Sequence, residues 1–361
     1  EKMEKLIYTS RPELKDEIIP FAELGIALFC YAMGILVMIP FISSINRKVG
    51  VGKYTIIGVV LFSLVFILPF WMTTYIELCI SLFIVGIFSG STDISMNALV
   101  SEVERTNKVN FMSAAHGFFS LGGVIGAGIG SFILVGLVSP KAHITIVATF
   151  ILLTNLFLSR NYIKIKESEH ESSETKTSIV GYSPLIIVAF IAFAIMGSEG
   201  AIENWSKLYL IDVVNVTSEK VAGYGFVFFS TTMALGRFFG DGISLKFGSE
   251  NTIIGGSILA IVSYLGIVSG GLYSVLGGFG LLGLGLSVII PELFRIAGQT
   301  EGVSPSGGIA FVSGVGFLGF LIGPVAMGFI SNQMGLKMSF IALLGVIIIA
   351  TFLAILRKVM K

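Results

Sequence analysis

Long apolar blocks, separated by short polar breaks, run through almost the whole chain, and most are about 20 residues or longer. A helix needs about 20 residues to cross roughly 30 Å of hydrocarbon, whereas a membrane strand needs only about 10 and alternates in polarity. These blocks are apolar on both faces, and a helix satisfies its own backbone hydrogen bonds in lipid. Only 12% of the 361 residues are charged, against about 25% in a soluble domain. The sequence therefore predicts an all-α integral membrane protein.

About eleven membrane-spanning helices are expected. Their ranges are 21–44, 54–73, 76–100, 112–138, 143–162, 182–212, 220–246, 252–270, 272–293, 306–333 and 336–357. The longest polar stretch, 164–181, has mixed charge and no apolar periodicity, so it predicts a linker. It separates an N-terminal bundle, 1–163, with five helices after a polar tail, from a C-terminal bundle, 182–361, with six.

Lys and Arg gather in the breaks on one side of the predicted bundle. These basic residues include Arg47, Lys48, Lys53, Lys164, Lys166, Lys246, Arg357 and Lys358. Because cytoplasmic loops carry the excess of positive charge, the linker and the C-terminus are expected in the cytoplasm. We expect a multi-pass protein of a cell membrane, the bacterial inner membrane, with its tail 1–20 outside. An odd helix count with an external tail leads us to expect one further helix before residue 1.

An internal repeat leads to the same expectation. A shift of about 197 residues places 116–132 over 313–329 with six identities, and a shift of about 198 places Lys48-Val49-Gly50 over Lys246-Phe247-Gly248. The first predicted helix therefore pairs with the seventh, and the fourth with the tenth. The partner of the sixth helix falls before residue 1.

The stretch GRFFGDGISLKFG at 236–248 resembles a loop motif of the major facilitator superfamily. The chain is more narrowly similar to the fucose-permease-related branch, in STDISMNALV (91–100), HGFFSLGG (116–123), EGAIENWSKLYL (199–210) and GFLGFLIGP (316–324). The resemblance implies the major facilitator fold, with two pseudo-symmetric helix bundles and a first family helix that is absent here. The first-half copy of the motif has Ser43 where the second half has Asp241, which implies a weaker loop interaction there.

Ionisable side chains at membrane depth cost at least about 2.5–3.5 kcal/mol each and usually face a cavity. Asp93, Glu199 and His116 are the candidates for proton coupling. Asp93 and Asn97 lie four residues apart, on one helix face, and the family resemblance implies that such an acid takes part in proton coupling and sugar recognition. Asp93 could instead pair with a neighbouring helix. His116 could instead be a packing residue bonded to a carbonyl.

Glu199 and Glu203 also share one helix face, beside Asn204 and Trp205. Carboxylate, amide and indole groups together are typical of a sugar site, so Asn97, Glu203, Asn204 and Trp205 are predicted to bind substrate. Alternatively, Glu203 lies near external water and Trp205 anchors the helix at the membrane interface. Ser287 could also line the cavity.

The family resemblance assigns Arg237 and Asp241 to a conformational latch between helices. A carboxylate there can lie against a helix N-terminus, where the dipole favours negative charge. Glu102 and Glu104 could join this network, but a solvated charge cluster is the simpler interpretation. Glu292 and Arg295 are expected to form a pair at a helix end.

Other functions find little support. The sequence holds no phosphate-binding loop, no catalytic motif and no metal-ligand spacing, and the formal net charge of +1 gives no reason to expect nucleic acid. We expect a monomer without a cofactor that is not an enzyme, in contact with lipid, protons and a small-molecule substrate. The leading hypothesis is proton-coupled transport of a sugar or sugar-like solute by alternating access. The alternatives are proton-driven export of amphipathic compounds and a non-transporting receptor or degenerate paralogue.

Overall fold

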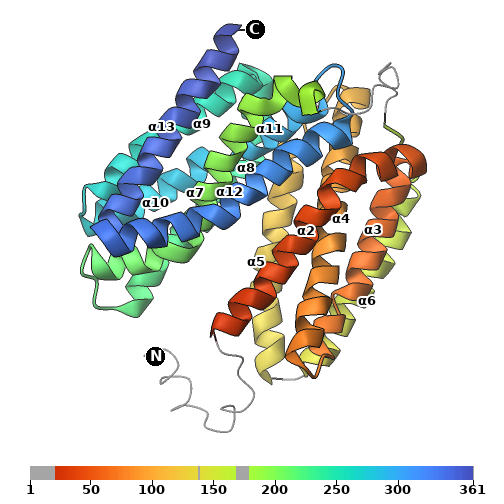
Figure 1. Ribbon diagram of the computed structural model, residues 1–361, viewed down its shortest axis with the longest axis horizontal. Helices are drawn as coiled ribbons and strands as arrows, with labels where there is room; N and C mark the ends of the chain where they lie inside the picture. The colour runs from red at the N-terminus through yellow and green to blue at the C-terminus, as the bar shows by residue number, and fades with distance from the viewer. Residues whose placement is uncertain (1–20, 137–138, 168–178, 361) are drawn as a thin grey trace.

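The computed structural model describes residues 21–136, 139–167 and 179–360, and each regular element in these ranges is a helix (Figure 1). The first group comprises α2 (Phe21–Val49), α3 (Val51–Val65), α4 (Tyr75–Asn107), α5 (Met112–Gly136) and α6 (Pro140–Ser159). The second group comprises α7 (Ile186–Asp212), α8 (Glu219–Phe247), α9 (Ser249–Val268), α10 (Leu272–Ser287), α11 (Ile289–Gly298), α12 (Pro305–Met334) and α13 (Leu336–Met360). Two short 3-10 helices, η2 (Leu68–Phe70) and η3 (Ile179–Leu185), follow α3 and precede α7.

The prediction of eleven helical spans is confirmed, since a helix or a broken helix lies at each expected place. Within the described ranges, nine stretches are long and apolar enough to cross a membrane by themselves. The helices α5 and α8, with 25 and 29 residues, run beside them. The predicted tail 1–20 and most of the predicted linker lie outside the described residues.

The ninth predicted span differs from the expectation of one helix over 272–293. It divides at Val288 into α10 and α11 and continues to Gly298. Pro291 has no N–H to offer the carbonyl of Ser287, which accounts for an interruption one turn earlier. Glu292 lies near the end of the predicted range and Arg295 in the added residues, and the two are 0% and 4% exposed. Hydropathy alone misplaced this end because the charged residues there are buried in pairs.

Two turns show the internal repeat directly. Gly50 joins α2 to α3 with φ +94°, and Gly248 joins α8 to α9 with φ +79°. Only glycine adopts this backbone region readily. Lys48 and Lys246, each two residues before its glycine, end the preceding helix. The matched conformations follow the 198-residue sequence shift, so the first and seventh predicted helices turn in the same way.

Glycines let particular helices approach closely. A Cβ atom added at Gly34 of α2 would overlap the backbone of Phe83 in α4, and one added at Gly86 would overlap that of Tyr31. In the second group, a Cβ at Gly323 of α12 would overlap the carbonyl of Gly197 in α7. Lipid gives no hydrophobic reason for helices to associate, so close contact of this kind supplies the packing energy.

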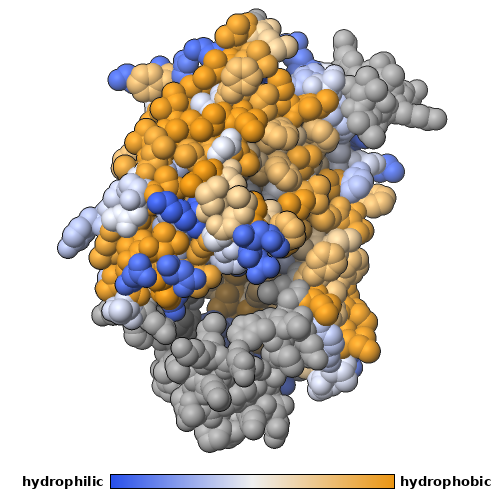
Figure 2. Space-filling model, turned by 60° about the vertical axis from the view of Figure 1, so that its left-hand side comes forward, coloured by the Kyte–Doolittle hydropathy of each residue, from blue (hydrophilic) through white to orange (hydrophobic). Residues whose placement is uncertain are grey.

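The outer surface is apolar. Figure 2 shows hydrophobic side chains over most of the visible flank, with hydrophilic residues toward the ends. Large exposed side chains include Phe150, Phe329 and Phe352, with exposed fractions of 69%, 71% and 62%. A water-facing surface of this size would be costly, so the flank suits contact with lipid chains. The chain is a multi-pass membrane protein.

The two helix groups meet near one end of the bundle. This is the end at which α6 finishes and η3 begins, and we call it the linker side. Ser43 near the end of α2 lies 2.9 Å, oxygen to oxygen, from Ser304 just before α12. Ser113 at the start of α5 donates its hydroxyl to the carbonyl of Arg237 in α8 at 2.7 Å. In Figure 1 α2 and α12 run side by side in the upper part and diverge below, so these contacts join the groups on the linker side.

Candidate functional site

A cavity of about 340 Å³ lies between the two groups and brings five ionisable side chains together. These are Asp93 from α4, His116 from α5, Glu199 and Glu203 from α7, and Arg237 from α8. Phenylalanine rings cover much of the remaining wall, namely Phe119, Phe294, Phe317 and Phe320. A concave, largely apolar space with a few convergent polar groups is the usual form of a small-molecule site.

Asp93 and Asn97 share a face of α4, as their spacing predicts. The Asn97 side-chain amide donates to Asp93 Oδ1 at 3.3 Å and to the Asp93 carbonyl at 3.0 Å. Both residues line the central cavity. Asp93 also borders a second, more apolar cavity of about 620 Å³ that extends between α2, α4 and α12. The carboxyl group therefore lies where the two spaces meet.

Arg237 crosses the boundary between the helix groups. Its Nη1 donates to Ser120 Oγ in α5 at 2.5 Å, and its Nη2 lies 3.5 Å from Glu199 Oε1 in α7. Its Nε is buried and has no hydrogen-bond partner among the described residues. A guanidinium presents donors in a fixed fork, and here one branch holds a hydroxyl and the other a carboxylate. A free donor is left beside the cavity.

His116 lines the same cavity with its ring centroid 5.6 Å from that of Phe294. Its Nε2 is buried and makes no hydrogen bond within the described part of the chain. This nitrogen therefore makes no bond to a carbonyl of the described residues. An imidazole nitrogen without a partner at a cavity wall can accept or donate a proton when a solute or water reaches it.

Three predicted binding residues do not line this cavity. The Asn204 amide donates back to the Gly200 carbonyl at 2.7 Å, and Trp205 Nε1 donates to the Pro324 carbonyl at 3.1 Å. Ser287 donates to its own helix, and faces a separate apolar hollow between α8, α9 and α10. Asn204 and Trp205 follow Glu203 directly, so the helical turn carries them away from the face that holds Glu199 and Glu203.

Arg295 is the centre of a buried charge cluster at the linker-side end of the cavity. Its Nη2 lies 2.6 Å from Asp241 Oδ1 and 2.9 Å from Glu104 Oε1, and its Nη1 pairs with Glu292. Glu104 belongs to the first helix group and the others to the second, so the cluster joins the groups. Removing one member of such a buried cluster leaves its partners uncompensated.

The first turn of α5 completes this junction. Asp241 accepts hydrogen bonds from the backbone N–H groups of Ser113 at 3.1 Å and Ala114 at 2.8 Å. Glu104 accepts one from the N–H of Met112 at 2.7 Å. The first N–H groups of a helix have no partner within it, and its dipole favours negative charge there. Two carboxylates from different helix groups therefore hold one helix end.

Sequence reasoning missed Arg295 as the centre of this cluster, whereas Glu104 joins the network of Asp241 as one of the two alternatives proposed. The prediction that Glu102 and Glu104 form a solvated cluster is wrong, because they are only 3% and 2% exposed. Glu292 and Arg295 do form a pair, but deep inside the protein. Arg237 and Asp241, predicted as neighbours in a latch, point apart: Arg237 into the cavity and Asp241 toward α5. The charged residues Glu292 and Arg295, in the last turns of an otherwise apolar span, were the sequence signal that could have indicated this buried cluster.

The corresponding junction in the first half is simpler. Ser43, at the position that matches Asp241 in the repeat, contacts the hydroxyl of Ser304. Ser304 in turn caps α12 by accepting a hydrogen bond from the N–H of Gly307 at 3.2 Å. One hydroxyl contact thus stands where the second half has a charged network.

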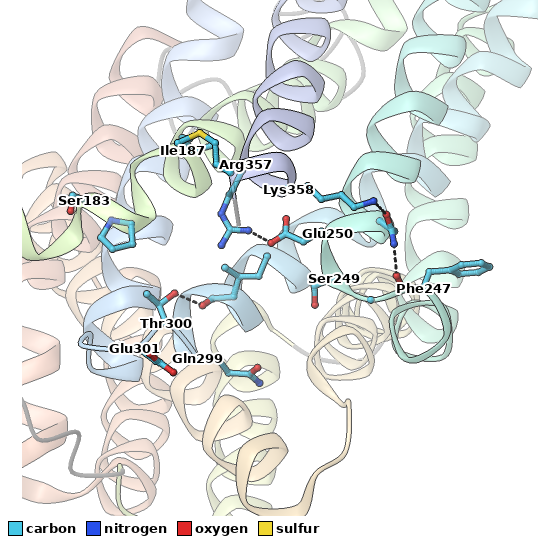
Figure 3. A pocket seen from close by; sticks show the side chains of 15 residues that line it. Ser183, Ile187, Phe247, Ser249, Glu250, Gln299, Thr300, Glu301, Arg357 and Lys358 are labelled. Carbon is cyan, nitrogen blue, oxygen red and sulfur yellow. Dashed lines mark hydrogen bonds and ion pairs between the residues drawn. The ribbon is translucent and has the colours of Figure 1, made fainter.

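A larger cavity, of about 870 Å³, lies elsewhere. It opens on the linker side of the second group, between η3, α9, α11 and α13, and contains none of the predicted site residues (Figure 3). Within it Arg357 pairs with Glu250, and Lys358 Nζ donates to Asn251 Oδ1 at 2.6 Å. These two bonds connect the ends of α9 and α13.

A helical membrane bundle with a charged cavity between two repeated halves is the architecture of a secondary transporter. The family model of the Major Facilitator Superfamily matches residues 5–299, and the chain belongs to that superfamily.

Known proteins are similar to this chain over nearly its whole length. An uncharacterized MFS-type transporter of Yersinia pestis is 28% identical over 340 residues, which is 93% of this chain and 87% of the relative. Membrane protein MosC of Rhizobium meliloti is 30% identical over 331 residues, 91% and 80% of the two chains. The transporter FucP in its outward conformation has a TM-score of 0.77 at 16% identity, with 94% and 91% covered. The similarity to FucP shows the fold.

Proposed function

We propose that the protein is a proton-coupled secondary transporter that carries a small polar solute, a sugar or sugar-like metabolite, by alternating access. One observation carries the proposal: Asp93, Glu199, Glu203, His116 and Arg237 meet in a single cavity between the two helix groups. Acids at membrane depth are expensive and are typical of ion or solute paths. Their gathering at one closed-ended space supports a site that opens to alternate sides.

Asp93 is the proposed proton-coupling group. It lies on the cavity wall with Asn97 as its hydrogen-bond donor, and a bound solute hydroxyl can take over that donor. Glu199 is the second candidate, because its partner Arg237 is 3.5 Å away and is also bonded to Ser120. Protonation of Glu199 would weaken the pair and leave Arg237 with its contact in the other helix group.

Glu203 and Asn97 are the proposed solute-binding groups, and His116 is a proposed proton relay. Asp241, Arg295 and Glu104 form the proposed latch. The excess of Lys and Arg on the linker side supports a cytoplasmic location for it, and in the proposed cycle the latch closes the cytoplasmic end. FucP, which has a similar fold, was crystallised in an outward conformation. This similarity supports an outward-facing state for the present structure.

Uptake into proteoliposomes tests the function. Labelled L-fucose and related sugars are offered under an imposed pH gradient, acidic outside. We expect accumulation that a protonophore abolishes. Asp93→Asn should lose accumulation while still exchanging solute, because a carboxamide binds a hydroxyl but cannot carry the proton. Glu301→Gln, an exposed acid on the linker side, is the matched control. Full accumulation by Asp93→Asn would contradict this assignment.

Export of amphipathic compounds is the second candidate. The cavity wall includes four phenylalanines together with Met96 and Met196, and such surfaces adapt to varied apolar shapes. Thermal-shift binding separates the two functions. Stabilisation by tetraphenylphosphonium but by none of the sugars would favour export.

A further inference from the structure

The start of the linker is fixed to the first helix group. The Ile165 carbonyl accepts a hydrogen bond from the N–H of Gly52 at 3.0 Å, and the N–H of Ile165 donates to the Tyr162 carbonyl at 3.0 Å. A Cβ atom at Gly52 would overlap the Tyr162 carbonyl, so only glycine permits this approach. The linker is therefore fixed to the turn between α2 and α3 just before Glu167.

Glu167 reaches from the linker to the first turn of α12. Its carboxyl group lies against the hydroxyl and the backbone N–H of Ser306. Both carboxyl oxygens and Ser306 Oγ are buried, and none completes a hydrogen bond of ordinary geometry with the described residues. The contact joins the first helix group, to which the linker is fixed, to the second. It lies at the weaker junction, where Ser43 replaces an acid.

Two charged groups act on Glu167. Arg47 at the end of α2 favours its charged form, and Glu102 of α4, itself paired with Arg105 at 2.5 Å, disfavours it. Burial outweighs these effects and raises the pKa of Glu167 above its usual range. A carboxylate buried without a full set of partners is costly, whereas a neutral carboxylic acid is much less so and gains a donor.

We propose that Glu167 is a gating residue that holds the linker-side junction closed as a neutral acid and ionises when the junction opens. The closed state then binds one proton that the open state releases to the same compartment. The inference rests on the alternating access of the proposed function. It adds a control of that movement by the pH on the linker side, separate from the protons that cross the membrane.

Proton linkage gives the direction in which pH shifts the equilibrium between the closed and open forms. In the closed state the pKa of Glu167 is raised, and in the open state water restores its ordinary value. Between these values the closed state holds more protons, so acid favours closure and a rise in pH favours opening. Asp241 caps α5 by a different means, since Arg295 compensates its charge.

Spin-label distances measure opening without any need for transport. Labels at Thr106→Cys and Lys246→Cys, both exposed on the linker side of different groups, are introduced with Cys30→Ser and Cys79→Ser. In nanodiscs the wild-type ratio of open to closed forms should rise by about threefold or more from about pH 5 to about pH 8. Glu301→Gln, the removal of a nearby exposed acid, should keep this profile.

Two variants at Glu167 should move in opposite directions. Glu167→Gln mimics the neutral acid and should stay closed across the range, with the Glu167-dependent rise removed. Glu167→Ala lacks the contact and should be more open than the wild type at acidic pH. An unchanged pH profile in Glu167→Gln, or no pH response in the wild type, would overturn the inference. If opening depends on pH and on Glu167 but the protein transports no solute, the inference about Glu167 stands. That result would count against the proposed function instead.

Discussion

The carboxylate of Asp241 in α8 accepts a hydrogen bond from the backbone N–H of Ala114 in α5 at 2.8 Å, although 127 positions separate the two residues. This bond crosses between the helix groups, and its acceptor is also paired with Arg295 at 2.6 Å. Movement of the groups on the linker side must break it. The bonds around Asp241 therefore set part of the free-energy difference between the closed and open forms.

Arg295→Gln should open the linker side and lower stability. The substitution leaves Asp241, Glu104 and Glu292 without their shared cation, and breaking a buried ion pair typically costs about 3–5 kcal/mol. Spin-label distances and thermal unfolding in detergent measure the two effects. Arg357→Gln is the control, because it removes a pair with Glu250 that lies within one helix group. Equal opening in both variants would contradict a specific role for Arg295.

Arg237 and Glu199 should be energetically coupled. Each single change, Arg237→Gln or Glu199→Gln, should lower stability, and the double variant should lose less than the sum of the two losses. For partners in contact, the interaction energy is typically about 0.5–3 kcal/mol. A double-mutant cycle by thermal unfolding measures it. Ser120→Ala, which removes the neutral partner of Arg237, should show smaller coupling with Glu199→Gln; strict additivity of the charged pair would contradict the ion pair.

Gly86→Ala should destabilise the protein by about 1–3 kcal/mol, the usual cost of overpacking. The new methyl group would overlap the backbone of Tyr31, which cannot move as a side chain can. Gly345→Ala in α13 is the control, since a Cβ there has nothing within 4 Å, and it should keep or slightly raise stability. Thermal unfolding of both variants in one detergent gives the comparison. Equal behaviour would argue against the close contact of α2 and α4.

Trp205→Phe should lower stability by about 0.5–1.5 kcal/mol, the net value of one hydrogen bond, and leave solute affinity unchanged. Its indole N–H donates to the Pro324 carbonyl, and Trp205 does not line the central cavity. Titration calorimetry with the transported solute measures affinity, and thermal unfolding measures stability. A tenfold loss of affinity with unchanged stability would support the substrate-binding role predicted from the sequence.

Much of the fold was predictable, because the constraint that lipid places on a backbone is severe. Span lengths and the glycines at positions 50 and 248 were readable from residue type and spacing alone. The joining of Asp93 and Asn97 followed from helical periodicity. The cluster around Arg295 was not predictable in this way, because its partners come from α4, α8 and α11. Sequence spacing carries no information on which distant helices place their charges together.

For Trp205 and Ser287 the sequence predicted binding roles, but neither side chain lines the central cavity. Each has a residue type typical of a solute site, but the direction of a side chain depends on where its helix lies against its neighbours. Trp205 bonds to a carbonyl at Pro324, and Ser287 to one in its own helix. Residue chemistry alone favoured binding roles for both, and tertiary packing gave both a different partner.

The unequal seams between the helix groups imply an order of events. Along α2 and α12 the hydroxyls of Ser43 and Ser304 and the contact of Glu167 with Ser306 bridge the boundary. Along α5 and α8 several charged bonds must break together. Thermal fluctuation should therefore part the first seam earlier and more often. Water would enter between α2 and α12 while the bonds between α5 and α8 remain. The two helix groups would then separate by rotation about the α5–α8 contact.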